Sequence, residues 1–126
     1  MRLRPEQHLR RQSDIRAVRE QGARTDCGAF TIWSRPRPAA PEGAPPGRIG
    51  PRVGVVAGTA AVGGAVLRNR AKRRLREIFR QQQHLLPGDC DLLLVARRAV
   101  VGWRFAELEA KFAGACARIA GRKKDA

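Results

Sequence analysis

Residues 66–80 read VLRNRAKRRLREIFR, and the pattern of apolar and basic side chains in this stretch decides the fold. On a helical wheel the apolar side chains gather in one stripe, which consists of Leu67, Ala71, Leu75, Ile78 and Phe79. Such a stripe is typical of a helix that packs on a sheet. The pattern predicts a helix over residues 65–85, stopped by Pro87 and Gly88.

The other sides of this helix are basic, and Glu77 carries the one opposing charge. The basic positions are Arg68, Arg70, Lys72, Arg73, Arg74, Arg76 and Arg80. Like charges four residues apart cost about 0.2–0.5 kcal/mol per pair, so the isolated helix repels itself. A polyphosphate partner removes this repulsion, and guanidinium groups fit phosphate oxygens well. The alternative is a solvated basic face, although solvated faces normally mix both signs of charge.

The whole chain has the same bias, since 26 Lys and Arg against 11 Asp and Glu give its 126 residues a net charge of +15. Such a surface attracts polyanions and favours a nucleic acid as the partner. We expect no membrane partner, because no segment approaches the ~20 apolar residues of a membrane span. We also expect no DNA, because a recognition helix for DNA usually mixes Asn, Gln, Ser and Arg for base edges.

Cysteine and histidine usage excludes several kinds of site. Cys27, Cys90 and Cys116 are odd in number and widely spaced, which favours reduced thiols over disulfides or a zinc site. His8 and His84 also stand alone. The first residues contain no apolar stretch of the kind that a secretory signal needs, so we expect a cytoplasmic protein.

Groups that could hydrolyse a phosphodiester are sparse. Such chemistry in a protein generally needs clustered carboxylates that hold Mg²⁺, or two histidines for acid and base catalysis. The nearest candidate is Asp89 with Asp91, which we interpret as an acidic pair in a turn because Pro87 and Gly88 precede it. We therefore expect no catalytic residue, metal ion or cofactor in the protein itself.

Weaker patterns place the remaining elements. A helix is expected over residues 9–22, with Ser13 as its cap and Gly22 at its end. Strands are expected over residues 30–33, 52–57 and 91–96, with residues 58–64 as a link. A last helix carries apolar residues at helical spacing from Phe105 to Ile119. This order predicts one α+β domain with an ordered core over residues 9–119, a flexible Pro-rich loop over 34–50 and a basic tail over 121–126.

The basic helix and its surroundings also resemble a known family. Residues 63–77 contain an Arg68-Asn69-Arg70 core, a Lys72-Arg73 step and an Arg76-Glu77 pair, and this stretch is similar to the signature of the bacterial ribonuclease P protein. Further positions fall in the family's order, namely Leu9, Asp14, Val18, Gly22, Phe30, Arg52, Val53, Gly54, Asp91, Ala96 and Arg97. The resemblance covers roughly residues 9–119 and is interrupted by the Pro-rich loop.

The resemblance implies a protein subunit of ribonuclease P, which acts with ribonuclease P RNA to remove the 5′ leader from precursor tRNA. It implies a fold similar to domain two of ribosomal protein S5, which is an α+β fold with a small mixed sheet packed by helices and a left-handed βαβ crossover. Catalysis is then expected in the RNA subunit, with Mg²⁺ bound there.

Two RNA-binding surfaces follow from the resemblance. The basic helix is expected to face the catalytic RNA through Arg68, Asn69, Arg70, Lys72, Arg73, Arg74 and Arg76. A cleft between the first helix and the sheet is expected to hold the leader through Arg10, Arg11, Ile15, Arg19, Trp33 and Arg52. Stacking of an unpaired base on an aromatic ring contributes about 1–3 kcal/mol, which is the role expected of Trp33. A packing role on the sheet is an equal alternative for Trp33.

The chain departs from the family pattern at three places. Residues 58–61 read Gly-Thr-Ala-Ala where the family usually has Ser-Lys-Lys, and Gly64 stands where Asn is usual. Ile15 and Arg19 replace aromatic residues of the first helix. Leader binding is therefore expected to depend on Trp33 and on charge. The main alternative function is a ribosomal or other structural RNA-binding protein of the same fold.

Overall fold

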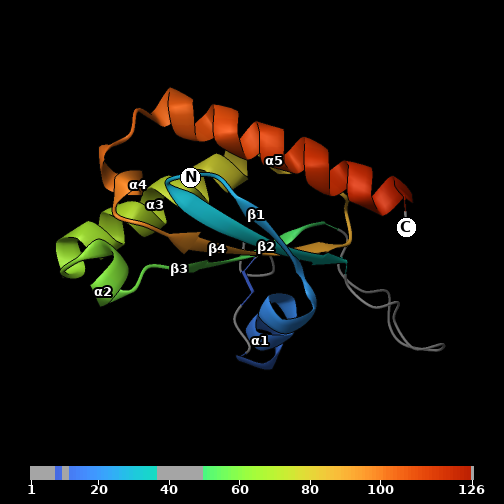
Figure 1. Cartoon of the computed structure of the whole chain (residues 1–126), viewed down its shortest axis with the longest axis horizontal. Coiled ribbons are helices and arrows are strands. Elements are labelled where there is room, and N and C mark those ends of the chain that lie inside the picture. Colours follow the sequence, from blue (N-terminus) through green and yellow to red (C-terminus); the bar gives the residue numbers. More distant parts are fainter. Residues whose placement is uncertain (1–7, 10–11, 37–49, 126) are drawn as a thin grey trace.

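The computed structural model describes residues 8–9, 12–36 and 50–125, with side chains up to residue 121, and a four-stranded sheet forms its centre (Figure 1). The strands are β1 (Ala23–Asp26), β2 (Phe30–Pro36), β3 (Arg52–Val56) and β4 (Cys90–Ala96), in the order β1-β2-β4-β3. β2 is antiparallel to β1 and to β4, whereas β3 is parallel to β4. The sheet is therefore mixed, as expected.

Helices cover both faces of the sheet (Figure 1). α1 (Gln12–Gln21) lies on one face, and α3 (Ala65–Gln82) and α5 (Phe105–Asp125) lie on the other. The single turns α2 (Thr59–Val62) and α4 (Ala99–Gly102) precede α3 and α5. Because α3 connects the parallel neighbours β3 and β4, the expected βαβ connection is present. The left-handed course of this connection stays an expectation from the resemblance.

The main core lies between the sheet and the pair α3 and α5. The predicted stripe of α3 is buried there, with Ala71, Leu75, Ile78 and Phe79 fully covered and Leu67 partly covered. α5 contributes the buried residues Leu108, Phe112, Cys116 and Ile119, which also follow the predicted helical spacing. The sheet contributes alternate residues of β2 and β4 to this core, because successive side chains of a strand point to opposite faces. These residues are Phe30, Ile32, Leu92 and Leu94.

A smaller apolar cluster holds α1 on the opposite face. Its buried members are Leu9, Val18 and Leu93, and Ile15, Trp33, Val56 and Val95 pack against them. Trp33 thus lies on the face that α1 covers, and it pairs with Leu93 across β2 and β4. Much less apolar area is available here than in the main core, so α1 is the more weakly held helix.

The first predicted helix differs from the observed one. α1 begins at Gln12, so Ser13 lies inside the helix and is not its cap. Leu9 instead lies beside β3, where its N–H donates to the carbonyl oxygen of Val53 at 2.8 Å. The helix ends at Gln21, and Gly22 follows as predicted. A Cβ on Gly22 would lie 2.2 Å from the carbonyl oxygen of Val18, so glycine is required at this close approach.

Several other boundaries also differ. β1 has no counterpart among the predicted strands. β2 continues beyond its predicted end to Pro36, because its pairing with β4 continues to Cys90. Residues 34–36 are therefore strand, and residues 37–49 of the expected loop lie outside the described residues. The link over residues 58–64 contains α2, and α4 forms where no element is expected. α3 ends at Gln82 and a 3-10 turn, η2 (Gln83–Leu85), follows, while α5 continues to Asp125 through most of the expected tail.

Candidate nucleic-acid interface

The outward face of α3 is the first candidate surface. It lies opposite the buried stripe, and its exposed members are Val66, Asn69, Arg70, Arg73 and Arg76. Arg68 and Lys72 are half-buried at its margins. Because these residues recur three or four positions apart, they form a continuous ridge along the helix. The structure thus brings together six of the seven residues that the resemblance assigns to the catalytic RNA.

Arg74, the seventh, points to the protein instead. Its Nη2 donates to the backbone oxygen of Trp103, and its Cζ lies 5.8 Å from the centre of the Phe105 ring. This distance is within the range of a cation–π contact. Burial and the neighbouring charge of Arg70 lower the pKa of the Arg74 guanidinium. Arg74 therefore joins α3 to the junction of α4 and α5.

The one acidic residue of the helix is neutralised within the helix. Oε2 of Glu77 accepts a hydrogen bond from Nε of Arg80 at 3.1 Å, and Oε1 accepts hydrogen bonds from Nη2 of Arg80 and from Nε2 of Gln81, the latter at 3.0 Å. The Arg80 guanidinium lowers the pKa of Glu77 to about 2. Since Glu77 and Arg80 cancel one another, the ridge from Asn69 to Arg76 keeps its positive charge.

A cleft beneath α1 is the second candidate surface. It has a volume of about 300 Å³, and its lining comes from α1, β3, β4, α3 and the segment before α1. The lining residues are His8, Leu9, Ile15, Val53, Gly54, Val55, Val56, Arg76 and Leu93. Ile15, which the resemblance assigns to the leader, is among the residues that line this cleft. Arg76, which the sequence assigns to the catalytic RNA, also lines it, so both surfaces meet at this residue.

The other residues predicted for the leader are distributed around this cleft. Trp33 packs against the apolar cluster that holds α1, which supports the packing alternative. Its side chain is only half-buried, so part of it stays accessible. Arg19 is exposed on α1. Arg10 and Arg11 lie outside the described residues. The position of Arg52 is different, because its guanidinium already has two carboxylate partners.

Arg52 is bound by acidic residues on both neighbouring elements. Its Nε and Nη2 donate to the two carboxylate oxygens of Asp91 at 2.9 and 2.7 Å, and its Nη1 lies 3.9 Å from Asp14 on α1. These carboxylates raise the pKa of Arg52. Asp91 is buried in β4, which agrees with the strand expected over residues 91–96 and corrects its interpretation as part of an acidic pair in a turn. Arg52 therefore links β3, β4 and α1.

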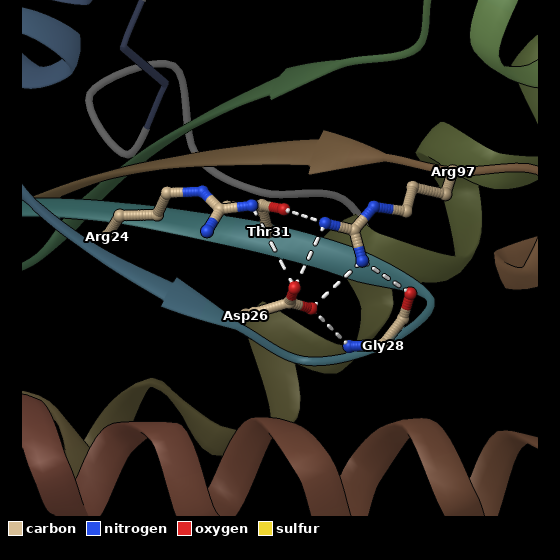
Figure 2. A network of polar contacts seen from close by, with 5 residues as sticks. All are labelled: Arg24, Asp26, Gly28, Thr31 and Arg97. Carbon is tan, nitrogen blue, oxygen red and sulfur yellow. Dashed lines mark hydrogen bonds and ion pairs between the residues drawn. The ribbon is translucent and has the colours of Figure 1, made fainter.

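A second polar network, which the sequence analysis missed, closes the turn between β1 and β2 (Figure 2). Nη1 of Arg97 donates to Asp26 at 2.9 Å and to the backbone oxygen of Gly28 at 2.7 Å, and Nη2 donates to Thr31 Oγ1 at 2.9 Å. The Arg97 hydrogen bond lowers the pKa of Asp26 to about 2. Because Nη1 and Nη2 of Arg97 make four hydrogen bonds to Asp26, Gly28 and Thr31, the network ties the turn to the end of β4. The local signal was the Asp-x-Gly order of a turn.

The cysteines form no site. Cys27, Cys90 and Cys116 are buried in the main core, and no disulfide joins any two of them. Burial raises the pKa of Cys27 to about 11 and that of Cys116 to about 12. Across the described ranges, no three His, Cys, Asp or Glu side chains come together as metal ligands, and no helix has the length and apolar character to cross a membrane.

The order of elements, the basic ridge and the cleft can now be compared with known proteins. The family model described as Ribonuclease P matches residues 3–120. The chain belongs to the ribonuclease P protein family. As a ribonuclease P protein, it is the protein subunit of ribonuclease P and takes part in tRNA 5′ maturation. This confirms the resemblance, and the ribosomal alternative is set aside.

Proteins with similar sequences are ribonuclease P protein components of other bacteria. The ribonuclease P protein component of Acidothermus cellulolyticus is 36% identical over 104 residues, which cover 82% of this chain and 80% of that protein. The one of Streptomyces avermitilis is 40% identical over 101 residues, which cover 77% and 76%. Among solved structures, the ribonuclease P protein of Thermotoga maritima in complex with 1-(4-fluorophenyl)-2-thiourea has a TM-score of 0.71 at 24% identity, with 89% and 99% covered. The Staphylococcus aureus protein has a TM-score of 0.68 at 18% identity, with 90% and 94% covered. The TM-scores show that this chain has the same fold as these solved ribonuclease P proteins.

Proposed function

We propose that this ribonuclease P protein binds the catalytic RNA with the outward ridge of α3 and holds the 5′ leader of precursor tRNA in the cleft beneath α1. Cleavage takes place on the RNA subunit, with Mg²⁺ held there. The protein supplies positive charge and a grip on the leader, and it acts in the cytoplasm.

One observation carries the assignment of the ridge. Arg70 and Arg73 are exposed, and neither has an acidic partner within the described part of the chain. From Val53 to Leu75 the sequence contains no Asp or Glu at all. Arginine forks that are fixed on one helix and left without carboxylates can bind phosphates in pairs. A folded RNA offers phosphates on a surface large enough to cover this ridge.

The cleft is suited to a single strand rather than to a duplex. Its walls contain the apolar side chains of Ile15 and Val56, and its described cation is Arg76. Apolar walls accept the faces of unpaired bases, and one arginine can hold the adjacent phosphate. Since Arg76 belongs to both surfaces, the leader and the catalytic RNA approach one another at this side chain.

We assign no catalytic role to the protein because three of its carboxylates are held in ion pairs with arginines. Asp91 is bound by Arg52, Glu77 by Arg80 and Asp26 by Arg97, so the described carboxylates in these pairs serve the fold. Cleavage of precursor tRNA by the purified protein alone, after nuclease treatment and with Mg²⁺ present, would contradict the proposal. Leader removal that increases when the protein is added to ribonuclease P RNA at near-physiological Mg²⁺ is the expected result.

The ridge is tested by its salt dependence. Each lost phosphate contact reduces the slope of log affinity against log salt by about 0.7–0.9. We expect Arg70→Gln and Arg73→Gln to weaken binding to ribonuclease P RNA and to reduce this slope. Arg118→Gln is the matched control, because Arg118 is exposed on α5, remote from the ridge in sequence and on another helix. An equal loss for all three variants would mean that binding is diffuse.

The cleft is tested by the length of the leader. The wild-type holoenzyme should bind precursor tRNA with a long leader more tightly than precursor tRNA with a one-nucleotide leader. Arg76→Gln should reduce this difference, whereas Arg70→Gln should weaken the assembly with the catalytic RNA and keep the difference. If leader length has no effect on the wild-type affinity, the cleft does not hold the leader.

A further inference from the structure

An apolar surface lies at the beginning of the basic ridge. Val66, the second residue of α3, has 82% of its area exposed, and among the described large apolar residues only Leu85 is also exposed, at 41%. A single exposed apolar residue is common. The position of Val66 is less common, because Asn69, Arg70 and Arg73 follow it at three, four and seven residues. Val66 therefore lies on the same line of the helix as the proposed phosphate contacts.

The neighbours of Val66 are small and uncharged. Ala60 and Ala61 of α2 are exposed, and so is Ala65 at the beginning of α3. Val62 is buried in the main core and anchors α2 against the rest of the protein. We name the exposed set Ala60, Ala61, Ala65 and Val66 the α2–α3 corner. Figure 1 shows α2 and the beginning of α3 together at one end of the molecule.

Charge decides what can cover this corner. No acidic residue occurs between Arg52 and Arg76, so any partner that covers Val66 also faces the positive ridge one helical turn away. A second copy of this chain, with its own charge of +15, would be repelled. RNA offers both required features, because its phosphates are negative while the faces of its unpaired bases and its riboses have apolar surface.

We propose that the α2–α3 corner contacts the face of an unpaired base or a ribose of the catalytic RNA, next to the phosphates that Arg70 and Arg73 bind. This inference rests on the proposed function of the ridge and adds a contact that does not depend on charge. Contacts to phosphates and sugars fix the position of a protein on a nucleic acid, whereas a contact to the face of a base requires a base that is unpaired and accessible. Val66 would then favour binding where the RNA presents apolar surface next to the phosphates that the ridge contacts.

The test compares Val66→Ser and Val66→Ala with Arg70→Gln in binding to ribonuclease P RNA over a series of salt concentrations. We expect Val66→Ser to weaken the affinity about three- to tenfold and Val66→Ala to weaken it less, because less apolar surface is removed. The salt slope should stay at the wild-type value, since no phosphate contact is lost. Leu85→Ser, the change at the other exposed apolar residue, should leave the affinity unchanged.

The outcomes separate this inference from the proposed function. If Arg70→Gln weakens binding and both Val66 variants bind as the wild type does, the corner is not a contact and the ridge is. If Val66→Ser weakens binding only together with a reduced salt slope, or only together with a lower melting temperature, a direct apolar contact is also contradicted. If neither Arg70→Gln nor the Val66 variants change binding, the proposed function of the ridge fails first.

Discussion

Arg52 on β3 and Asp91 on β4 form a two-point ion pair across parallel strands, in which Nε and Nη2 each donate to one carboxylate oxygen. The side chain of Asp91 is 4% exposed and that of Arg52 is 25% exposed. Asp14 adds a third charge from α1 at 3.9 Å from Nη1 of Arg52. The pair therefore stabilises the edge of the sheet and also the position of the helix that covers the cleft.

Removing the arginine should be costly, because it leaves a buried carboxylate without its counter-charge. We expect Arg52→Met to reduce the free energy of unfolding by about 3 kcal/mol, and Asp91→Asn, which keeps an acceptor, by about 1 kcal/mol. Urea unfolding measures both. Arg16→Met, on the exposed side of α1, should change stability by less than about 0.5 kcal/mol. Equal stability of Arg52→Met and the wild type would show that the pair contributes nothing.

The docking of Arg74 on Trp103 and Phe105 predicts a separation of stability from RNA binding. Arg74→Gln should lower the melting temperature, because α3 loses its contact with the junction of α4 and α5. Its salt slope for ribonuclease P RNA should equal that of the wild type. Arg73 is adjacent and exposed, so Arg73→Gln should show the opposite pattern. Its slope of log affinity against log salt should fall by about 0.7–0.9, and its melting temperature should not change. A reduced slope for Arg74→Gln would place Arg74 among the phosphate contacts.

The pKa of Asp26 predicts how the β1–β2 turn responds to acid. Its pKa is lowered from 3.8 to about 2 by Arg97, so the folded state binds this proton less readily than the unfolded state. The stabilisation is therefore complete above pH 4 and is lost as the pH falls towards 2. The difference in melting temperature between the wild type and Asp26→Asn should shrink over this range. A constant difference between pH 6 and pH 2 would contradict the assignment.

Gly28 and Gly102 provide a matched pair of substitutions. Gly28 has a φ of +82°, and a Cβ there would lie 2.8 Å from Cη2 of Trp103. Gly28→Ala should therefore cost about 1–2 kcal/mol from the backbone conformation alone, with a further cost from displacing the indole ring. Gly102 has no atom within 4 Å of such a Cβ and lies in α4, so Gly102→Ala should be neutral or slightly stabilising. Thermal unfolding of both variants distinguishes a specific requirement at Gly28 from a general sensitivity to alanine.

The elements that could be predicted from the sequence are those with a long apolar period. The stripe from Leu67 to Phe79 and the spacing from Phe105 to Ile119 predict α3 and α5, because only one face of each helix is apolar. β1, α2 and α4 escape this reasoning because each has only four residues, which is too few for a period to show. The strand residues 34–36 escape it because Pro36 normally indicates a loop, and its pairing with Cys90 depends on a distant segment.

The candidate site divides in the same way. The exposure of Arg70 and Arg73 follows from the helical wheel, so it could be predicted from the sequence. The pairing of Arg52 with Asp91 could not, because 39 residues separate them and their meeting depends on the register of β3 with β4. Likewise, Arg74 is withdrawn by a contact to the end of α4, which is not visible in the sequence pattern. Arg76 reaches the cleft only because α3 packs beside β3.

The place of β4 between β2 and β3 has a consequence for biosynthesis. β4 is the last of the four described strands to be synthesised, and it is the only one of them that is hydrogen-bonded to β3. A nascent chain that ends before Cys90 holds all of α3 but no completed sheet to cover its apolar stripe. Folding of the sheet must therefore wait until β4 has been synthesised, as expected for a structure built from distant pairings. A prematurely terminated product would be an unfolded polycation, a natural target for proteolysis.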